Sequence, residues 1–351
     1  MTGYIPLNRN NTVSNPASTN EVNEEAVHQA RRKGLFWALV NITVITAVII
    51  GVTRSDWGTT ELWPALQNAQ WAWLLLGWVL MNLAVFVLGH RWHALLPKSN
   101  AVSGSFLGVA LSAALLLNYA IPGPFGELAA AWFVSKRSDL SVTQALVAGS
   151  TARLIGLLSA AVGAVCLWPL VTLELAPEYS PIFQVLVVGM AACSVLLAAL
   201  IVLPNRFLNV VGTDSPSKGR LVLINILEAL VACRQLGPMA YMKATFWSVI
   251  GHVLAALGVY AVLFAVFGGL DEMGVVFAYL TMTCSSAFAF LVPGSQWPWD
   301  AVMATMLGST TDLSALSAGT AALLLRMAQL AMMGVGVCAL QVVMRSPKEM
   351  S

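Results

Sequence analysis

Two acids and two arginines stand inside apolar stretches of this sequence, in two pairs with the same spacing. Glu127 precedes Arg153 by 26 residues, and Asp300 precedes Arg326 by 26 residues. A charged side chain near the middle of a membrane costs about 2.5–3.5 kcal/mol on insertion scales, so such residues pair, face water or hold a charged ligand. Because arginine presents a planar fork that fits phosphate, the four residues predict a polar site for an anionic head group.

Each acid ends a break in an apolar run. The first break reads Asn118-Tyr119-Ala120-Ile121-Pro122-Gly123-Pro124-Phe125-Gly126-Glu127, and the second reads Pro293-Gly294-Ser295-Gln296-Trp297-Pro298-Trp299-Asp300. Proline interrupts a helix, and a short helix that restarts near each acid would offer its N-terminus to an anion. The candidate substrate- or ion-binding residues are Asn118, Pro122, Gly126, Glu127, Arg153, Pro293, Gly294, Asp300 and Arg326.

The same charges also fit a purely structural role. Glu127 with Arg153, and Asp300 with Arg326, would then be ion pairs that tie each interrupted segment to the span after it. In the interpretation that we prefer, the four line a polar cavity in which the arginines hold the anion. An acid beside such a site can carry a coupling proton.

Three further residues are candidate head-group contacts. Arg91 stands near the end of an expected span, where anchoring at the lipid head groups is the simpler interpretation. Trp297 and Trp299 lie within the second break and are expected to line the site. His252 is interpreted as a hydrogen-bonded core histidine rather than a proton relay.

The five cysteines show no C-x-x-C pattern and no histidine spacing suited to zinc. In apolar segments a cysteine behaves as a small hydrophobic residue. We therefore expect no metal, no cofactor and no disulfide. The sequence also shows no His/Asp cluster of the kind that an enzyme acting on lipid phosphates would need, so no catalytic residue is assigned and no enzyme is expected.

The composition predicts a membrane protein. Hydrophobic residues make up 58% of the chain and charged residues 10%, against about 25% charged residues in a typical soluble domain. Several apolar runs reach the roughly 20 residues that a helix needs to cross the hydrocarbon core. The net charge of +2 gives no reason to expect a nucleic-acid partner.

The expected fold is an all-α polytopic membrane protein with about six transmembrane helices and two re-entrant helical hairpins in an inverted repeat. The domain is expected over residues 35–345, between a disordered cytoplasmic tail (1–34) and a short cytoplasmic tail (346–351). Its repeat units cover about 104–170 and 274–343. The spans are expected at about 35–52, 73–88, 143–170, 181–203, 244–267 and 318–343, and the hairpins at 104–135 and 274–307.

The distribution of basic residues supports this count. With six spans and two returning hairpins, 15 of the 18 lysines and arginines fall on the side of the N-terminus. Only Arg54 falls on the other side, and Arg153 and Arg326 lie within spans. Basic residues concentrate on the cytoplasmic side, so both termini are expected in the cytoplasm and the protein in the inner (cytoplasmic) membrane. The two hairpins then enter from opposite sides, a plan typical of secondary transporters.

Helix rise predicts that the four charges share one level. At about 1.5 Å per residue, each lies roughly 13 Å from the expected end of its helix, close to the middle of a core about 30 Å thick.

The run from Asn118 to Glu127, the later run from Pro293 to Asp300, the pair Arg91-Trp92, and Arg326 resemble the lysylphosphatidylglycerol synthase transmembrane-region family. The resemblance covers about residues 35–345 and implies a flippase-like protein with a role in envelope-lipid transport. It also implies that these residues occupy motif positions: Pro122, Gly126, Glu127, Arg153, Pro293, Asp300 and Arg326.

Some positions depart from the family pattern. Ala130 stands where many relatives carry arginine, Ala152 stands where an acid often precedes the arginine, and Asp300 replaces glutamate. The soluble aminoacyl-transferase domain that some relatives carry is not found after the last span, so lysyl transfer by this chain is not expected.

The expected function is transport of a lipid-linked or amphiphilic anion across the cytoplasmic membrane through the arginine–carboxylate site. The expected partners are membrane lipids or a lipid-linked anionic substrate. The alternative, from another class, is a non-transporting membrane subunit that supports envelope lipid or glycan synthesis, with a homo-oligomer or an envelope-synthesis protein as partner.

Overall fold

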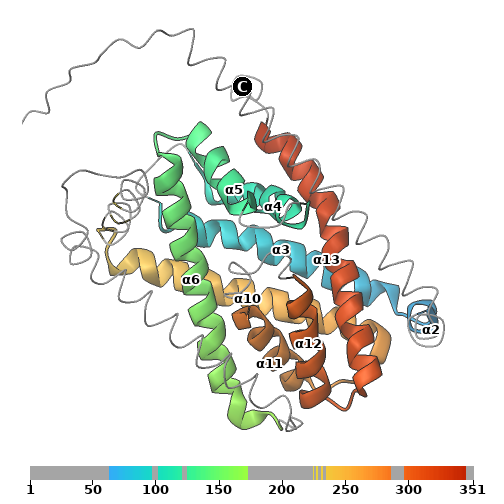
Figure 1. The fold of residues 1–351 in the computed structure, drawn as a ribbon. Coiled ribbons are helices and arrows are strands. Elements are labelled where there is room, and N and C mark those ends of the chain that lie inside the picture. The colour runs from blue at the N-terminus through green and yellow to red at the C-terminus, as the bar shows by residue number, and fades with distance from the viewer. Residues whose placement is uncertain are drawn as a thin grey trace, which may run out of the picture.

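The computed structural model describes residues 63–96, 102–120, 125–172, 224, 227, 231, 235–285 and 296–344, and these residues contain helices and no strand (Figure 1). The elements in chain order are α2 (Trp63–Gln67), α3 (Trp71–His93), α4 (Gly104–Ala120), α5 (Phe125–Lys136), α6 (Val142–Leu167), the 3-10 turn η2 (Trp168–Leu170), α10 (Pro238–Phe267), α11 (Glu272–Ser285), α12 (Gln296–Thr310) and α13 (Ala315–Met344).

Four helical segments are long and apolar enough to cross a membrane: Trp71–His93, Val142–Leu170, Pro238–Phe267 and Ala315–Met344. They correspond to four of the six expected spans, which confirms a multi-pass all-α membrane protein. The expected spans at 35–52 and 181–203 lie outside the described residues, as do both terminal tails. Helix α10 begins before the expected 244, at Pro238 after Gly237 with φ 77°, because proline suits the first position of a helix.

Two pairs of shorter helices stand between the long ones. Helices α4 and α5 have 17 and 12 residues, and α11 and α12 have 14 and 15. At about 1.5 Å per residue they measure roughly 18–26 Å, less than the hydrocarbon core of about 30 Å. These lengths suit the expected hairpins, but the return of each hairpin to its side of entry stays a prediction. The breaks at 121–124 and 286–295, with Pro122, Pro293 and Gly294, lie outside the described residues.

The helices follow each other in two similar sets. Glu127 and Asp300 are 173 residues apart, as are Arg153 and Arg326. The same offset carries α3 onto α10, α5 onto α12 and α6 onto α13, with ends that differ by at most six residues. The repeat units expected at 104–170 and 274–343 therefore extend backwards, so that α3–α6 form a first unit and α10–α13 a second.

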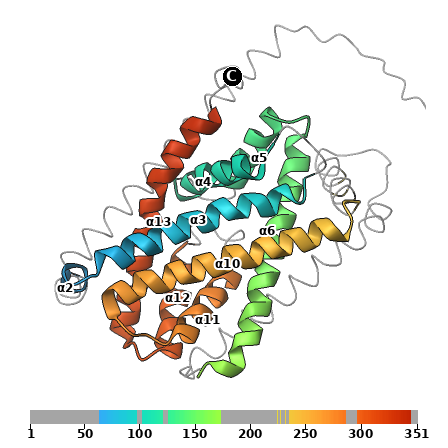
Figure 2. The same ribbon diagram turned by 180° about the vertical axis from the view of Figure 1, so that it is seen from behind.

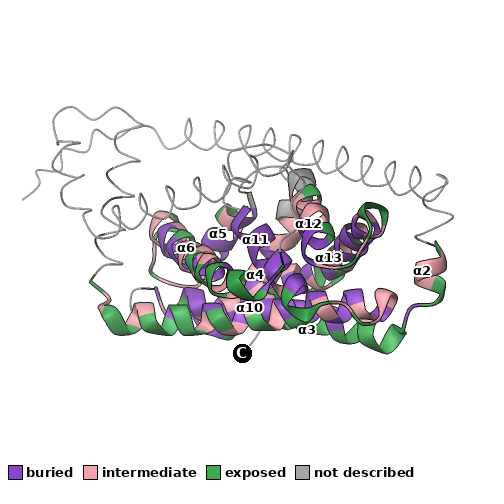
Figure 3. Ribbon diagram, turned by 90° about the horizontal axis from the view of Figure 1, so that it is seen from below, coloured by how far each residue is buried: buried purple, intermediate pink, exposed green. Residues whose placement is uncertain are grey.

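Helices α3 and α10 run antiparallel along each other and form one layer beneath the remaining described helices (Figures 2 and 3). A Cβ added to Gly77 would lie 2.6 Å from the carbonyl oxygen of Gly258, and one added to Gly258 would lie 2.9 Å from that of Gly77. Small residues let helices approach closely in a membrane. The outer face of this layer carries exposed large hydrophobic residues such as Leu75 and Phe246, as expected for contact with lipid.

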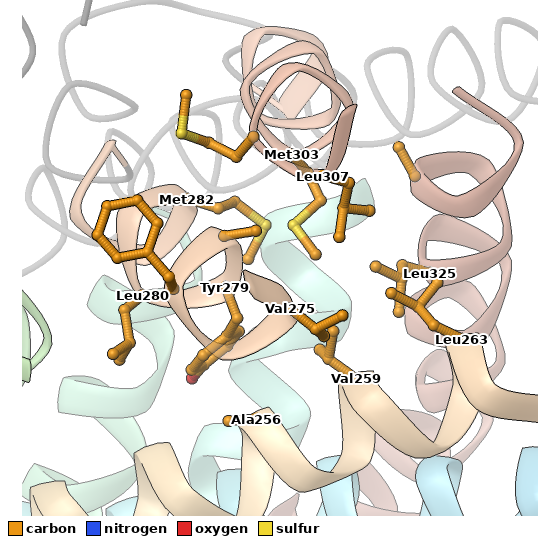
Figure 4. Packing of buried hydrophobic residues seen from close by; sticks show 14 of the residues in the cluster. Ala256, Val259, Leu263, Val275, Tyr279, Leu280, Met282, Met303, Leu307 and Leu325 are labelled. Atoms are coloured by element: carbon orange, nitrogen blue, oxygen red, sulfur yellow. The ribbon is translucent and has the colours of Figure 1, made fainter. Parts of the chain in front are cut away.

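The two units interleave. Helix α4 packs against α13 of the other unit, and α11 packs against α6. A Cβ added to Gly336 on α13 would lie 2.8 Å from the carbonyl oxygen of Ser112 on α4, so a small residue is needed at this crossing. The second unit closes around a buried apolar cluster that joins α10, α11, α12 and α13, with Val259, Val275 and Leu307 among its members (Figure 4).

Candidate functional site

Glu127 and Arg153 form the first ion pair. Glu127 lies in the first turn of α5, where the helix dipole favours an acid. A capping box between Ser141 and Gln144 fixes the start of α6, and this start sets the position of Arg153 along the helix. Arg153 Nη1 donates a hydrogen bond to Glu127 Oε1. The two side chains remain 31% and 24% exposed, so the pair is partly accessible.

Asp300 and Arg326 form the second ion pair, at the matching positions of α12 and α13. Arg326 Nε donates to both carboxylate oxygens of Asp300, at 3.0 and 3.2 Å, and Nη2 donates to Oδ1 at 2.8 Å. The fork geometry fixes the carboxylate at two points. Arg326 is 10% exposed and Asp300 is 28% exposed, so the carboxylate is the accessible member.

Each pair joins an acid near the start of a short helix to an arginine in the long helix that follows. Both pairs therefore arise within their own unit, with the spacing of 26 residues that the sequence shows. Their convergence on one shared site, as expected from helix rise, stays a prediction.

The remaining candidates divide by position. Gly126 is buried at the start of α5. Asn118 lies in the last turn of α4, and Trp297 lies in the first turn of α12, but the side chains of both lie outside the described residues. Trp299 packs against the apolar cluster of the second unit. Its indole Nε1 is buried and finds no hydrogen-bond acceptor within the part of the chain that the structure describes.

Arg91 lies in a different environment from the head-group anchor that its position in the sequence suggests. Its residue is only 9% exposed, because α3 packs beneath α6 and turns the side chain inward. The guanidinium occupies the space beside Gly156 of α6, where an added Cβ would overlap Nη1 and lie 3.1 Å from Cζ. Its Nε is buried and makes no hydrogen bond to any described residue.

A hydrogen-bonded chain from three helices lies next to Arg91. The His252 ring nitrogen Nε2 lies 2.8 Å from the Gly156 carbonyl oxygen, and Nδ1 lies 3.2 Å from the Tyr279 hydroxyl. A carbonyl only accepts, so Nε2 carries the proton, and in the neutral ring Nδ1 accepts from the Tyr279 hydroxyl. Figure 4 shows this hydroxyl directed toward α10. The hydrogen bonds expected of His252 are therefore present, while its role as a core histidine rather than a proton relay stays a prediction.

Sequence reasoning missed Gly156 and Tyr279. Both lie in apolar segments where glycine and tyrosine are ordinary, and only the crossing of α3, α6, α10 and α11 brings them together. Within the described ranges, no group of three or more His, Cys, Asp or Glu side chains is placed to hold a metal ion.

The family described as the lysylphosphatidylglycerol synthase TM region matches residues 38–336. Comparison with curated proteins and with solved structures gave no match.

Proposed function

Because the chain belongs to the lysylphosphatidylglycerol synthase transmembrane-region family, we propose that it moves a lipid-linked or amphiphilic anion across the cytoplasmic membrane. The observation that carries this proposal is the recurrence of an arginine–carboxylate pair with a partly exposed carboxylate at the same place in both units. A binding group must stay within reach of its ligand, and the exposed fractions of 24% for Glu127 and 28% for Asp300 leave both carboxylates accessible.

The proposed mechanism uses exchange of partners. A phosphate oxygen competes with Glu127 for Arg153, or with Asp300 for Arg326, since both carboxylate and phosphate fit the guanidinium fork. The displaced carboxylate then faces water or takes up a proton, which couples anion binding to proton movement. No chemical bond is broken in this cycle, and the protein is proposed to act as a transporter rather than an enzyme.

The proposed orientation follows the basic residues. In this orientation both termini lie in the cytoplasm. The first hairpin opens to the cytoplasm and the second to the outside, so that each arginine binds the anion from one side of the membrane. The partners are membrane lipids, in the inner membrane of the cell.

The test is head-group movement in proteoliposomes that contain the purified full-length chain. A fluorescent phosphatidylglycerol analogue is bleached from outside, and the protected fraction measures lipid that has not crossed. Arg153→Ala and Arg326→Ala are each expected to reduce the rate at least tenfold, whereas Lys136→Ala, which removes an exposed charge stacked on Trp132, leaves it unchanged.

A charge exchange separates binding from stability. The double variant Glu127→Arg with Arg153→Glu keeps an ion pair between α5 and α6 but moves the guanidinium to the other helix. If this variant moves lipid as fast as the wild-type protein, the pair is structural and the proposed role of Arg153 is wrong. A wild-type protein that is folded and moves no lipid would favour the non-transporting subunit.

A further inference from the structure

The charges around α6 do not balance. Arg153 is neutralised by Glu127, and Arg326 by Asp300. Arg91 is buried to nine-tenths, yet within the described residues neither an ion pair nor a hydrogen bond reaches its guanidinium. Burial of a cation without an anion costs free energy. A ligand that supplies the missing negative charge would therefore be stabilised beside Arg91.

The polar groups beside Arg91 do not supply that charge. His252 and Tyr279 form a hydrogen bond with each other, and His252 also donates a hydrogen bond to the Gly156 carbonyl oxygen. Both lie within electrostatic range of Arg91, but both are neutral in this arrangement. Arg153 also lies within electrostatic range and adds positive potential.

The second unit has no counterpart of this arginine. The offset of 173 residues places Phe264 at the position of Arg91 and Gln329 at the position of Gly156. Phe264 packs against Trp73 with ring centroids 4.9 Å apart. Among the described residues of the two units, a buried arginine without a carboxylate partner therefore occurs once.

We propose that Arg91 is a second anion-binding residue of the first unit, beside Arg153, and that it takes the phosphodiester of a lipid head group with one net negative charge. This inference rests on the proposed function and specifies its substrate class. One net negative charge balances one guanidinium. A zwitterionic head group offers the same phosphodiester but brings an ammonium group, which the unbalanced charge of Arg91 repels.

Gly156 is then part of the site. Without a Cβ at this position, the guanidinium can lie against α6 beside the His252–Tyr279 pair. An alanine here would contact the far end of a flexible side chain, which can move aside without disturbing the backbone. Gly156→Ala is therefore expected to keep the fold and the charge while shifting the binding atoms.

The experiment is lipid binding to the purified full-length protein, measured by titration and native mass spectrometry in a neutral detergent. The probes are dihexanoyl phosphatidylglycerol, dihexanoyl phosphatidylcholine and inorganic phosphate. We expect one phosphatidylglycerol to bind at least about tenfold more tightly than phosphatidylcholine. Arg91→Gln is expected to weaken phosphatidylglycerol binding by about tenfold or more and to remove this preference, since hydrogen bonds to charged groups are strong.

Matched variants decide the outcome. Lys136→Gln removes one exposed charge and should change neither affinity, whereas Gly156→Ala should weaken phosphatidylglycerol binding even though no charge is lost. If inorganic phosphate displaces the lipid at comparable concentration, the proposed lipid specificity is wrong. Unchanged binding in Gly156→Ala, together with unchanged binding in a folded Arg91→Gln, overturns the assignment of Arg91; should Arg91→Gln not fold, Gly156→Ala decides alone.

The binding assay is independent of transport. If the wild-type protein binds phosphatidylglycerol through Arg91 but moves no lipid, the proposed transport fails and the binding site stands. If lipid moves and Arg91→Gln binds as the wild-type protein does, the binding site fails and the proposed transport stands.

Discussion

Replacing Asp300 by asparagine keeps the size of the side chain but removes the charge that balances Arg326. Three N–H contacts converge on this carboxylate, the shortest at 2.8 Å. Removing one partner of a buried ion pair costs about 3–5 kcal/mol, whereas exposed pairs contribute about 0–1 kcal/mol. Because Arg326 is 10% exposed and Asp300 is 28% exposed, we expect Asp300→Asn to lower the free energy of unfolding by about 2–3 kcal/mol.

The assay is equilibrium unfolding in mixed micelles, with tryptophan fluorescence as the signal. Arg326→Met keeps much of the aliphatic stem and also removes the pair. The double variant should lose less than the sum of the two single losses, by about 1–2 kcal/mol, because it leaves no uncompensated charge at this position. Additive losses, or an Asp300→Asn protein as stable as the wild type, would refute the buried-pair reasoning.

The first pair provides an internal comparison. Glu127 and Arg153 are 24% and 31% exposed, so solvent screens the charge that remains after one partner is removed. Glu127→Gln is therefore expected to cost only about 1 kcal/mol. A larger loss for Glu127→Gln than for Asp300→Asn would contradict the use of exposure to rank the two pairs.

Three further predictions concern packing, hydrogen bonding and topology. Gly274→Ala should destabilise the protein by about 1–3 kcal/mol in the same unfolding assay, since the new Cβ meets the Thr310 backbone carbonyl where α11 begins and α12 ends. Gly334→Ala, in open space within α13, should be neutral or stabilising by up to about 1 kcal/mol. Tyr279→Phe should cost about 1 kcal/mol because the imidazole it faces loses its donor, and a fully neutral effect would argue against that hydrogen bond. Single cysteines at Ser138 and Asp312, introduced after the native cysteines are replaced, should react with an impermeant maleimide from opposite sides of the membrane, and labelling from the same side would exclude the inverted arrangement.

Much of the helical pattern could be read from the sequence because its signals are local. Prolines and glycines marked the breaks, and apolar length marked four described spans. The spacing of 26 residues indicated which acid could pair with which arginine, although the preferred interpretation was a cavity in which the arginines hold an anion. An arginine that follows an acid at the same spacing in two repeated segments can be recognised in the sequence without knowledge of helix packing.

The environment of Arg91 could not be read in the same way. Nothing near it in the sequence distinguishes an arginine at a head-group surface from one turned against Gly156, which lies on another helix. Its surroundings depend on where α3 crosses α6 and α10, and that crossing depends on small residues scattered along three helices. Whether the two ion pairs share one level depends likewise on helix tilt, which rise per residue does not give.

The interleaving of α4 with α13 and of α11 with α6 has a consequence for biogenesis. During synthesis, α4 enters the membrane long before its packing partner near the C-terminus exists. Its unsatisfied face must be tolerated by lipid or shielded by a chaperone until α13 inserts and completes the contact. Truncation before α13 should therefore leave the first half without its closing element, whereas the two halves produced as separate chains still carry the α4–α13 and α11–α6 contact surfaces.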